Sequence, residues 1–108
     1  MKIHELKLDN EYFDDVESGL KTFEIRKNDR NYKAGDLLAL SRFKNGHYFA
    51  TRDGFYLKKE NAEQIVSLNE ADTILMEVAY ITDYEQKDGY VVMGIKPYLR
   101  YVSADLED

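Results

Sequence analysis

Short runs of alternating apolar and polar residues recur along the chain and predict a protein built mainly of β-strands. Successive side chains of a strand point to opposite faces, so a half-buried strand shows apolar residues at every second position. Such runs, or largely apolar runs of strand length, cover residues 2–8, 21–26, 37–43, 47–51, 73–84 and 90–98. Asn45-Gly46 and Asp53-Gly54 are pairs typical of two-residue hairpin turns, and they predict tight connections after the third and fourth runs.

A single helix is predicted between the first two strands. Its apolar residues recur at the three- and four-residue spacing of one helix face, at Tyr12, Phe13, Val16 and Leu20. Asp9 or Asn10 is the candidate N-cap, and Ser18-Gly19 marks the end. Residues 59–71 are ambiguous, because their apolar positions also fit a short helix that begins after Asn61.

Many short strands and one early helix favour an α+β, mainly-β fold, in the form of a small closed or nearly closed β-barrel. A chain of 108 residues fits one domain. We expect this domain to cover residues 1–101. The acidic segment 102–108 is expected to be a disordered tail.

Composition excludes several classes of function. The chain has no cysteine, so it has no disulfide, thiol nucleophile or thiolate metal site. Its two histidines, His4 and His47, are far apart in sequence and lack the carboxylate spacing of a metal site. No apolar run approaches the roughly 18 residues needed to cross a bilayer. We therefore expect a cytoplasmic protein without a metal, cofactor or membrane partner.

Charge is distributed unevenly. The net charge of −6 argues against indiscriminate nucleic-acid binding, yet residues 21–44 carry seven Lys/Arg and only three acidic residues. A basic segment on an acidic protein suits a small anionic ligand or a short piece of nucleic acid. A chance partition of charge over stretches of this length is the alternative explanation.

The segment with the most specific chemistry is Gly19-Leu20-Lys21-Thr22-Phe23-Glu24-Ile25-Arg26, inside this basic stretch. As a strand, it places Phe23 and Ile25 on one face, which we expect to face the core. Glu24 and Arg26 then share the other face, where the carboxylate holds the guanidinium and presents its planar fork to a ligand. A salt-bridged pair on a solvated strand face is the alternative reading.

This segment resembles the signature Gly-x-Lys-x-x-Glu-x-Arg of the ASCH (activating-signal-cointegrator homology) domain at every fixed position. The flanks are also similar to small bacterial and phage ASCH-like proteins, over Ile3-His4-Glu5-Leu6-Lys7, residues 26–30, Gly35-Asp36-Leu37-Leu38 and residues 88–97. The resemblance covers about residues 3–43 and 88–97. It implies a PUA-like barrel with a ligand cleft beside the signature strand.

The resemblance implies that Lys21, Glu24 and Arg26 line this cleft and that the ligand is RNA or a nucleotide. Lys27 and Arg30 extend the positive surface, and Tyr32 or Tyr48 is a candidate to stack on a base. His4 is either a further ligand contact on the first strand or a structural histidine. The predicted ligand-binding residues are therefore Lys21, Glu24, Arg26, Lys27, Arg30, His4 and Tyr32.

Two other functions stay open. One ASCH branch deacetylates acetylcytidine with a threonine three residues after the signature lysine, but that position is Glu24 here, which argues against this activity. A different hydrolysis of a modified nucleoside or RNA would use Lys21 and Glu24, with the carboxylate as base. A barrel that acts through protein contacts, such as residues 50–70, is the third possibility.

Overall fold

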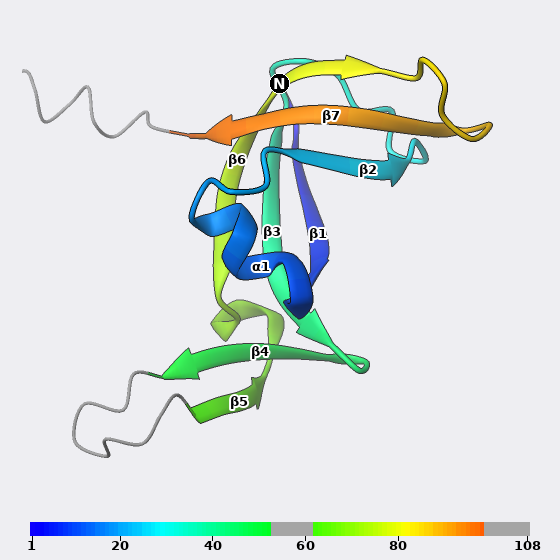
Figure 1. Cartoon of the computed structure of the whole chain (residues 1–108). Coiled ribbons are helices and arrows are strands. Elements are labelled where there is room, and N and C mark those ends of the chain that lie inside the picture. Colours follow the sequence, from blue (N-terminus) through cyan, green and yellow to red (C-terminus); the bar gives the residue numbers. More distant parts are fainter. Residues whose placement is uncertain (53–61, 99–108) are drawn as a thin grey trace, which may run out of the picture. The chain divides into compact units, whose positions relative to one another are not determined.

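The computed structural model describes residues 1–52 and 62–98, which form strands and one α-helix (Figure 1). In chain order the elements are β1 (Ile3–Asp9), α1 (Asn10–Glu17), β2 (Phe23–Lys27), β3 (Leu37–Lys44), β4 (His47–Arg52), β5 (Ala62–Val66), a 3₁₀ turn (Leu68–Glu70), β6 (Thr73–Thr82) and β7 (Tyr90–Pro97). The predicted small α+β, mainly-β class is thus confirmed. Within the described residues, no helix has the length and apolar character needed to cross a membrane.

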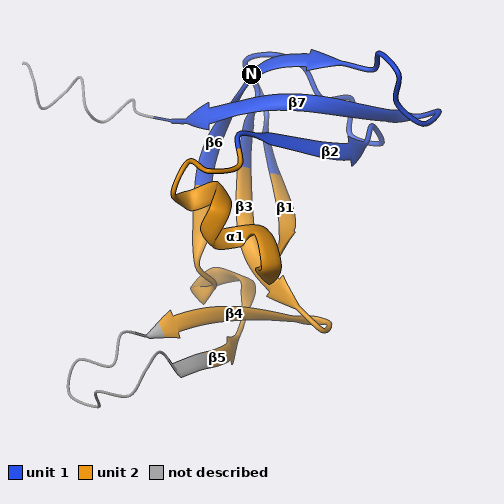
Figure 2. Cartoon of the chain, in the orientation of Figure 1, with its two compact units in different colours: residues 1–4, 22–38, 75–108 blue, residues 5–21, 39–74 orange. Residues whose placement is uncertain are grey.

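Two compact units divide the chain (Figure 2). Unit 1 contains residues 1–4, 22–38 and 75–108, and unit 2 contains residues 5–21 and 39–74. The strands β1, β3 and β6 each contribute residues to both units. The single domain over 1–101 stays a prediction, and the predicted tail at 102–108 lies outside the described residues.

Unit 1 is built around the antiparallel strands β2, β7 and β6, in that order (Figure 1). β6 is hydrogen-bonded on its other side to the start of β3, through the Val78 amide and the Asp36 carbonyl at 2.8 Å. The buried aliphatic and methionine side chains described for this unit are Leu37, Leu38, Met76, Val78, Val91, Met93 and Ile95.

Unit 2 combines α1 with the β3–β4 hairpin and β5. Asp9 caps α1, since its carboxylate accepts the Glu11 amide at 2.9 Å. Phe13 and Val16 bury the inner helix face as predicted, but the prediction was wrong for Tyr12 and Leu20, which are exposed. The hairpin turn is at Asn45-Gly46, where both residues have positive φ as a type I′ turn requires. The buried apolar residues of unit 2 are Leu6, Leu8, Phe13, Val16, Leu40 and Ala50.

The ambiguous segment resolves into a strand. Ala62–Val66 pairs with β4 along its whole length, from Tyr48↔Val66 to Arg52↔Ala62. The helical alternative over these residues is therefore wrong, because cross-strand pairing with β4 supplies the backbone hydrogen bonds that a helix would have made internally. The predicted Asp53-Gly54 turn lies outside the described residues.

The described strands do not form the predicted closed barrel within either unit. Among the described residues, β2 is the outermost strand of unit 1 and β5 is the outermost strand of unit 2, each with one neighbour. Neither unit closes its own strands into a ring, so the PUA-like barrel stays a prediction.

Candidate functional site

The signature strand β2 turns Glu24 and Arg26 inward. Glu24 is only 3% exposed, whereas Phe23 and Ile25 are 42% and 51% exposed. The prediction that Phe23 and Ile25 face the core is therefore wrong. The prediction that Glu24 and Arg26 share a face and hold each other is confirmed, since Arg26 Nε donates to Glu24 Oε1 at 2.9 Å.

The neighbouring strand explains this inversion. Glu24 and Arg26 lie opposite Met93 and Val91 of β7, both of which are buried. Directly opposed residues of an antiparallel pair project to the same face, so the charged positions follow the apolar residues of β7 inward. An acid and a base buried together can satisfy each other, whereas either one alone would be costly.

A buried His–Asp pair lies in the same unit. The ring nitrogen Nε2 of His4 on β1 is 2.9 Å from Oδ2 of Asp36, which precedes β3. The Asp36 carboxylate also accepts the backbone amides of Lys2 and Lys33, each at 3.1 Å. Burial raises the pKa of the Asp36 carboxyl, but the hydrogen bonds from His4 and the two amides outweigh it and hold that pKa below its usual value.

Tyr32 connects the two pairs. Its ring meets the His4 ring edge-on, with centroids 4.8 Å apart, and its side chain is buried. Burial raises the pKa of the Tyr32 phenol, although the charges of Arg26 and Arg30 act against this and those of Asp29 and Glu24 act with it. Tyr32 is thus within electrostatic reach of the Glu24–Arg26 pair and in contact with the His4–Asp36 pair. We call His4, Glu24, Arg26, Tyr32 and Asp36 the polar cluster.

Local structure fixes Tyr32 in place. The Asn28 side chain accepts the Tyr32 amide at 2.9 Å, and the Asn28 amide donates to the Gly89 carbonyl at 2.8 Å. Asn31 adopts a positive φ of 54°, which asparagine tolerates better than most residues. The polar loop between β2 and β3 is therefore tied to the β6–β7 turn and delivers an aromatic side chain inward.

Two polar atoms of the cluster stay accessible. His4 Nδ1 and the Tyr32 hydroxyl make no hydrogen bond to the protein among the described residues. In the same part of the chain, every fully buried side-chain nitrogen or oxygen has a hydrogen-bond partner. Since these two atoms have none, they are not fully buried and keep some contact with solvent. The Arg26 side chain is 22% exposed. The cluster can therefore offer an imidazole nitrogen, a phenol and a guanidinium to a ligand.

The other predicted site residues divide between the two units. Lys27 and Arg30 belong to unit 1 and are exposed. Lys21 belongs to unit 2, where its ammonium lies 5.3 Å from the centroid of the Tyr12 ring. Its place in a common site with Glu24 and Arg26 stays a prediction from the signature. Tyr48 also lies in unit 2, packed edge-on against Phe43 at 4.9 Å.

Asp36 was missed as a site residue, because Gly35-Asp36 reads as an ordinary turn before an apolar strand. The sequence contained one signal, the position of Asp36 directly before an apolar strand. When that strand packs into the core, the carboxylate is buried with it and needs a hydrogen-bond donor there.

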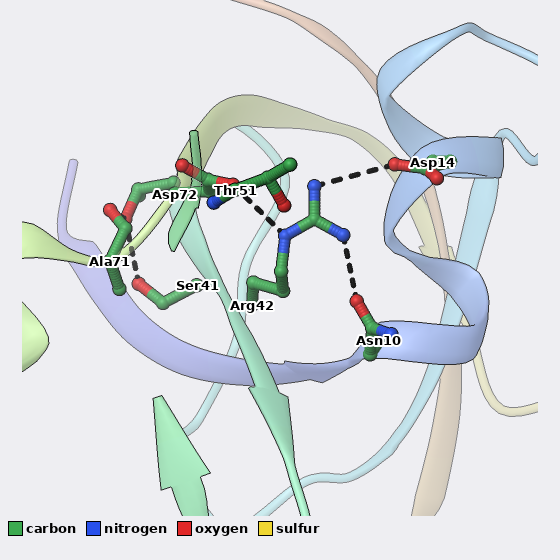
Figure 3. Close-up of polar contacts among 8 residues, drawn as sticks. Asn10, Asp14, Ser41, Arg42, Thr51, Ala71 and Asp72 are labelled. Carbon is green, nitrogen blue, oxygen red and sulfur yellow. Dashed lines mark hydrogen bonds and ion pairs between the residues drawn. The ribbon is translucent and has the colours of Figure 1, made fainter. Parts of the chain in front are cut away.

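A second buried charge, Arg42 on β3, organises unit 2 (Figure 3). Its Nε donates to Asp72 at 3.0 Å, its Nη1 to the Asn10 side chain at 2.7 Å and its Nη2 to Asp14 at 3.4 Å. The guanidinium also lies over the Phe13 ring, 4.1 Å from its centroid. Asp72 in turn accepts the Thr51 amide at 2.9 Å.

These contacts link α1, β3, β4 and the segment before β6 through the Arg42 side chain. We call this arrangement the Arg42 clamp, and its role is structural. All three guanidinium nitrogens are used within the protein, so the clamp offers little to a ligand. The sequence held a signal for it, since an arginine in the middle of an apolar strand run needs buried partners.

In the described part of the chain, no three His, Cys, Asp or Glu side chains are grouped to hold an ion. The polar cluster contains charged, hydrogen-bonding and aromatic groups. Such groups suit an anionic or heteroaromatic ligand.

Comparison with known proteins gives the family. Over 45 residues the chain is 53% identical to the "Uncharacterized 12.9 kDa protein in GpA 3'region" of Escherichia phage P2. This match spans 42% of the chain and 41% of the phage protein. A family model described as "Domain of unknown function (DUF3850)" matches residues 3–95, which include every residue of the polar cluster. The chain therefore belongs to the DUF3850 family.

Proposed function

We propose that this protein binds RNA or a nucleotide through the polar cluster, assisted by Lys21, Lys27 and Arg30. The observation that carries the proposal is the occurrence, in one unit, of a buried His4–Asp36 pair in contact with the Tyr32 ring and of an inward-facing Glu24–Arg26 pair whose charges act on the Tyr32 phenol. The similarity of Gly19–Arg26 to the ASCH signature supports the same ligand class, and with it the PUA-like barrel.

Each group has a distinct part in this binding. Arg26 and the exposed cations Lys27 and Arg30 attract the phosphate, and the carboxylate of Glu24 fixes the Arg26 fork in one orientation. Tyr32 Oη and His4 Nδ1 supply hydrogen bonds to a sugar or base edge. Asp36 orients the His4 ring from the opposite nitrogen. Binding of this kind weakens as the salt concentration rises. The protein's cations release counterions from the phosphates, and this release is less favourable at high salt.

The test is a titration of labelled protein with short single-stranded RNAs and with free nucleotides, followed by backbone amide shifts. We expect shifts concentrated at His4 and over residues 22–36. Arg26→Met should weaken the affinity by about tenfold, the loss of one charge-assisted hydrogen-bonding group. Lys7→Met removes a cation on β1 in unit 2 and is the matched control, expected to bind as wild type.

An unchanged affinity in Arg26→Met, together with shifts outside residues 22–36, would rule out this site. If no RNA or nucleotide produces shifts at millimolar concentration, the remaining possibility is the barrel that acts through protein contacts.

The His4–Asp36 pair favours a second candidate, hydrolysis of a modified nucleoside or RNA. A carboxylate that orients an imidazole whose other nitrogen reaches solvent is the arrangement of a general base. Turnover should then be lost in His4→Gln and reduced in Glu24→Gln, each with the fold intact by circular dichroism. A panel of acylated nucleosides and short RNAs that gives no product would exclude this activity.

A further inference from the structure

The outward face of β2, β7 and β6 carries an aromatic row that the polar cluster does not use. Phe23 on β2 lies opposite Gly94 on β7, and Gly94 lies opposite Tyr80 on β6. Phe23 is 42% exposed and Tyr80 is 64% exposed, so both aromatic side chains face solvent. We call Phe23, Gly94 and Tyr80 the aromatic row. The next row, Ile25, Val92 and Thr82, is uncharged as well.

An irregularity in β6 is what brings Tyr80 into this row. Val78 pairs with Ile95, so a regular ladder would place Ala79 opposite Gly94 and would turn Tyr80 inward. Instead the register shifts between Val78 and Tyr80. A bulge of this kind re-aims the side chains that follow it, and such features are enriched beside functional sites.

Glycine at position 94 is not explained by its φ angle or its packing. It lies inside β7, where glycine weakens a strand, and its φ is not positive. A Cβ added at Gly94 would meet only the Tyr80 Cβ, at an ordinary contact distance of 3.6 Å. Neither the φ angle nor the packing therefore requires glycine. A glycine inside a strand marks a bulge, a bend or the close approach of a ligand, and Gly94 lies both beside the β6 bulge and between two exposed aromatic residues.

The dimensions of the aromatic row fit a planar ring. Phe23 and Tyr80 are two strand spacings apart, which is roughly 9.6 Å between their backbones. A flat ring placed over Gly94 would stand about 4.8 Å from each of the two flanking backbones, and a modest lean of the two aromatic side chains toward it would bring them to the contact distance of about 3.5–4 Å. The absence of a side chain at Gly94 lets such a ring descend between the two aromatic groups.

The ends of this face carry cations. Lys27 lies one row beyond Ile25, and Lys96 lies one row beyond Gly94; both are exposed. Glu77 lies opposite Lys96, so two lysines and one carboxylate border the uncharged rows. Aromatic rings flanked by cations match a single-stranded nucleic acid, whose bases stack on the rings while its phosphates meet the lysines.

We infer that an unpaired nucleobase of a single-stranded RNA stacks over Gly94 between Phe23 and Tyr80. The inference deepens the proposed function by assigning a base-stacking surface to the face of β2 opposite the polar cluster. The polar cluster keeps the hydrogen-bonding and phosphate contacts of the proposed function, and the aromatic row adds the stacking of an unpaired base, with Lys27 and Lys96 near its phosphates. The two surfaces can therefore be tested separately.

The experiment measures binding of a fluorescently labelled short oligoadenylate by anisotropy at constant salt. Phe23→Ala and Tyr80→Ala should each weaken binding by roughly tenfold, the typical effect of losing one base–aromatic stack. Gly94→Val keeps both rings but fills the space between them, and should weaken binding to a similar extent. Gly94→Ala guards against misfolding, since it fits without a clash and should still reduce affinity.

Tyr84→Ala is the matched control, because Tyr84 is another highly exposed tyrosine of unit 1 that lies outside the aromatic row. It should bind within about twofold of wild type, well below the effect of one lost stack. Adenosine monophosphate should displace the label more effectively than ribose 5-phosphate, because ribose 5-phosphate can occupy the polar cluster but has no base to stack in the aromatic row. Thermal melting checks that every variant is folded.

Three results would overturn the inference. If the Phe23, Tyr80 and Gly94 variants bind as wild type while Arg26→Met is weakened, the polar cluster alone binds RNA. If wild-type protein binds no oligoadenylate, both the proposed function and the stacking surface fail. If the wild type is a dimer by sedimentation and Phe23→Ala and Tyr80→Ala are monomers that bind RNA normally, this face is an interface between two copies of the chain.

Discussion

Arg26 Nε and Glu24 Oε1 are 2.9 Å apart on the buried face of β2, while the apolar residues of the same strand face solvent. Strand β2 is thus inverted relative to its hydrophobic pattern. Burial of an ion pair in place of two apolar residues is a poor way to gain stability, since the desolvation of the charges offsets much of their attraction. The inversion is therefore better explained by what each face does: the inner face holds the polar cluster, and the outer face holds Phe23 of the aromatic row.

The Glu24–Arg26 pair should show direct energetic coupling. Glu24→Gln is expected to lower the free energy of unfolding by about 1–3 kcal/mol, because a buried charge-assisted hydrogen bond is weakened. A double-mutant cycle with Arg26→Met should give a coupling of about 0.5–3 kcal/mol, measured by urea denaturation. Lys27→Met, an exposed neighbour, should stay within about 0.5 kcal/mol of wild type. A coupling indistinguishable from zero would mean that the pair contributes nothing to the fold.

Local features of this fold could be predicted from the sequence. The Asp9 cap, the Asn45-Gly46 turn and the inner face of α1 each depend on residues within a few positions of one another. The shared face of Glu24 and Arg26 was predictable for the same reason. Strand alternation states which residues share a face, but it does not state which face is covered.

The features that escaped prediction all depend on distant partners. The burial of Glu24 follows from its pairing with Met93, far along the chain. His4 and Asp36 are 32 residues apart, and Arg42 and Asp72 are 30 residues apart. The local pattern indicates that Asp36 and Arg42 need buried partners, but it does not identify which residues these are. The bulge that aims Tyr80 outward is a further example, since it appears only when β6 is paired with β7.

The lowered pKa of Asp36 makes stability depend on pH in the acid range. A carboxyl whose pKa is lower in the folded state stabilises the fold at neutral pH, and this contribution is lost as the pH falls through the folded pKa. The loss of stability caused by Asp36→Asn should therefore be constant above about pH 5 and should shrink below about pH 4. Chemical denaturation of both proteins across this range measures it. If the difference in the free energy of unfolding between wild type and Asp36→Asn does not change with pH, the Asp36 charge is not the stabilising element. Asp29→Asn, in the exposed loop, is the control.

Tyr32 should resist ionisation, because burial raises the pKa of its phenol. The neutral phenol is the favoured form in the fold, so its contribution is present below about pH 10 and is lost as the pH rises through the folded pKa. An alkaline absorbance titration of the nine tyrosines should contain one late step that is missing in Tyr32→Phe. Tyr84→Phe should retain that step. If Tyr32→Phe titrates like wild type minus an ordinary tyrosine, burial does not disfavour the ionised form of Tyr32, and the buried position of its ring beside His4 is refuted.

The Arg42 clamp should be a major determinant of stability in unit 2. Arg42 is only 8% exposed, and its guanidinium holds Asp72, Asn10 and Asp14 while it covers the Phe13 ring. Arg42→Met retains much of the side-chain volume but removes these hydrogen bonds, so we expect a loss of about 2–4 kcal/mol in the free energy of unfolding. Most of this loss should come from Asp72 and Asn10, because the Asp14 carboxylate is largely exposed and lies farther away.

Lys44→Met is the matched control for Arg42→Met. Lys44 is the second residue after Arg42 on β3, and its ammonium lies 5.9 Å from the centroid of the Phe49 ring, a longer cation–π contact than that of Arg42. Its removal should cost less than about 1 kcal/mol. Hydrogen exchange adds a second readout, since α1 should lose protection in Arg42→Met but not in Lys44→Met. Equal losses in the two variants would show that the clamp is no more than one cation among several, and that α1 is held by Phe13 and Val16 alone.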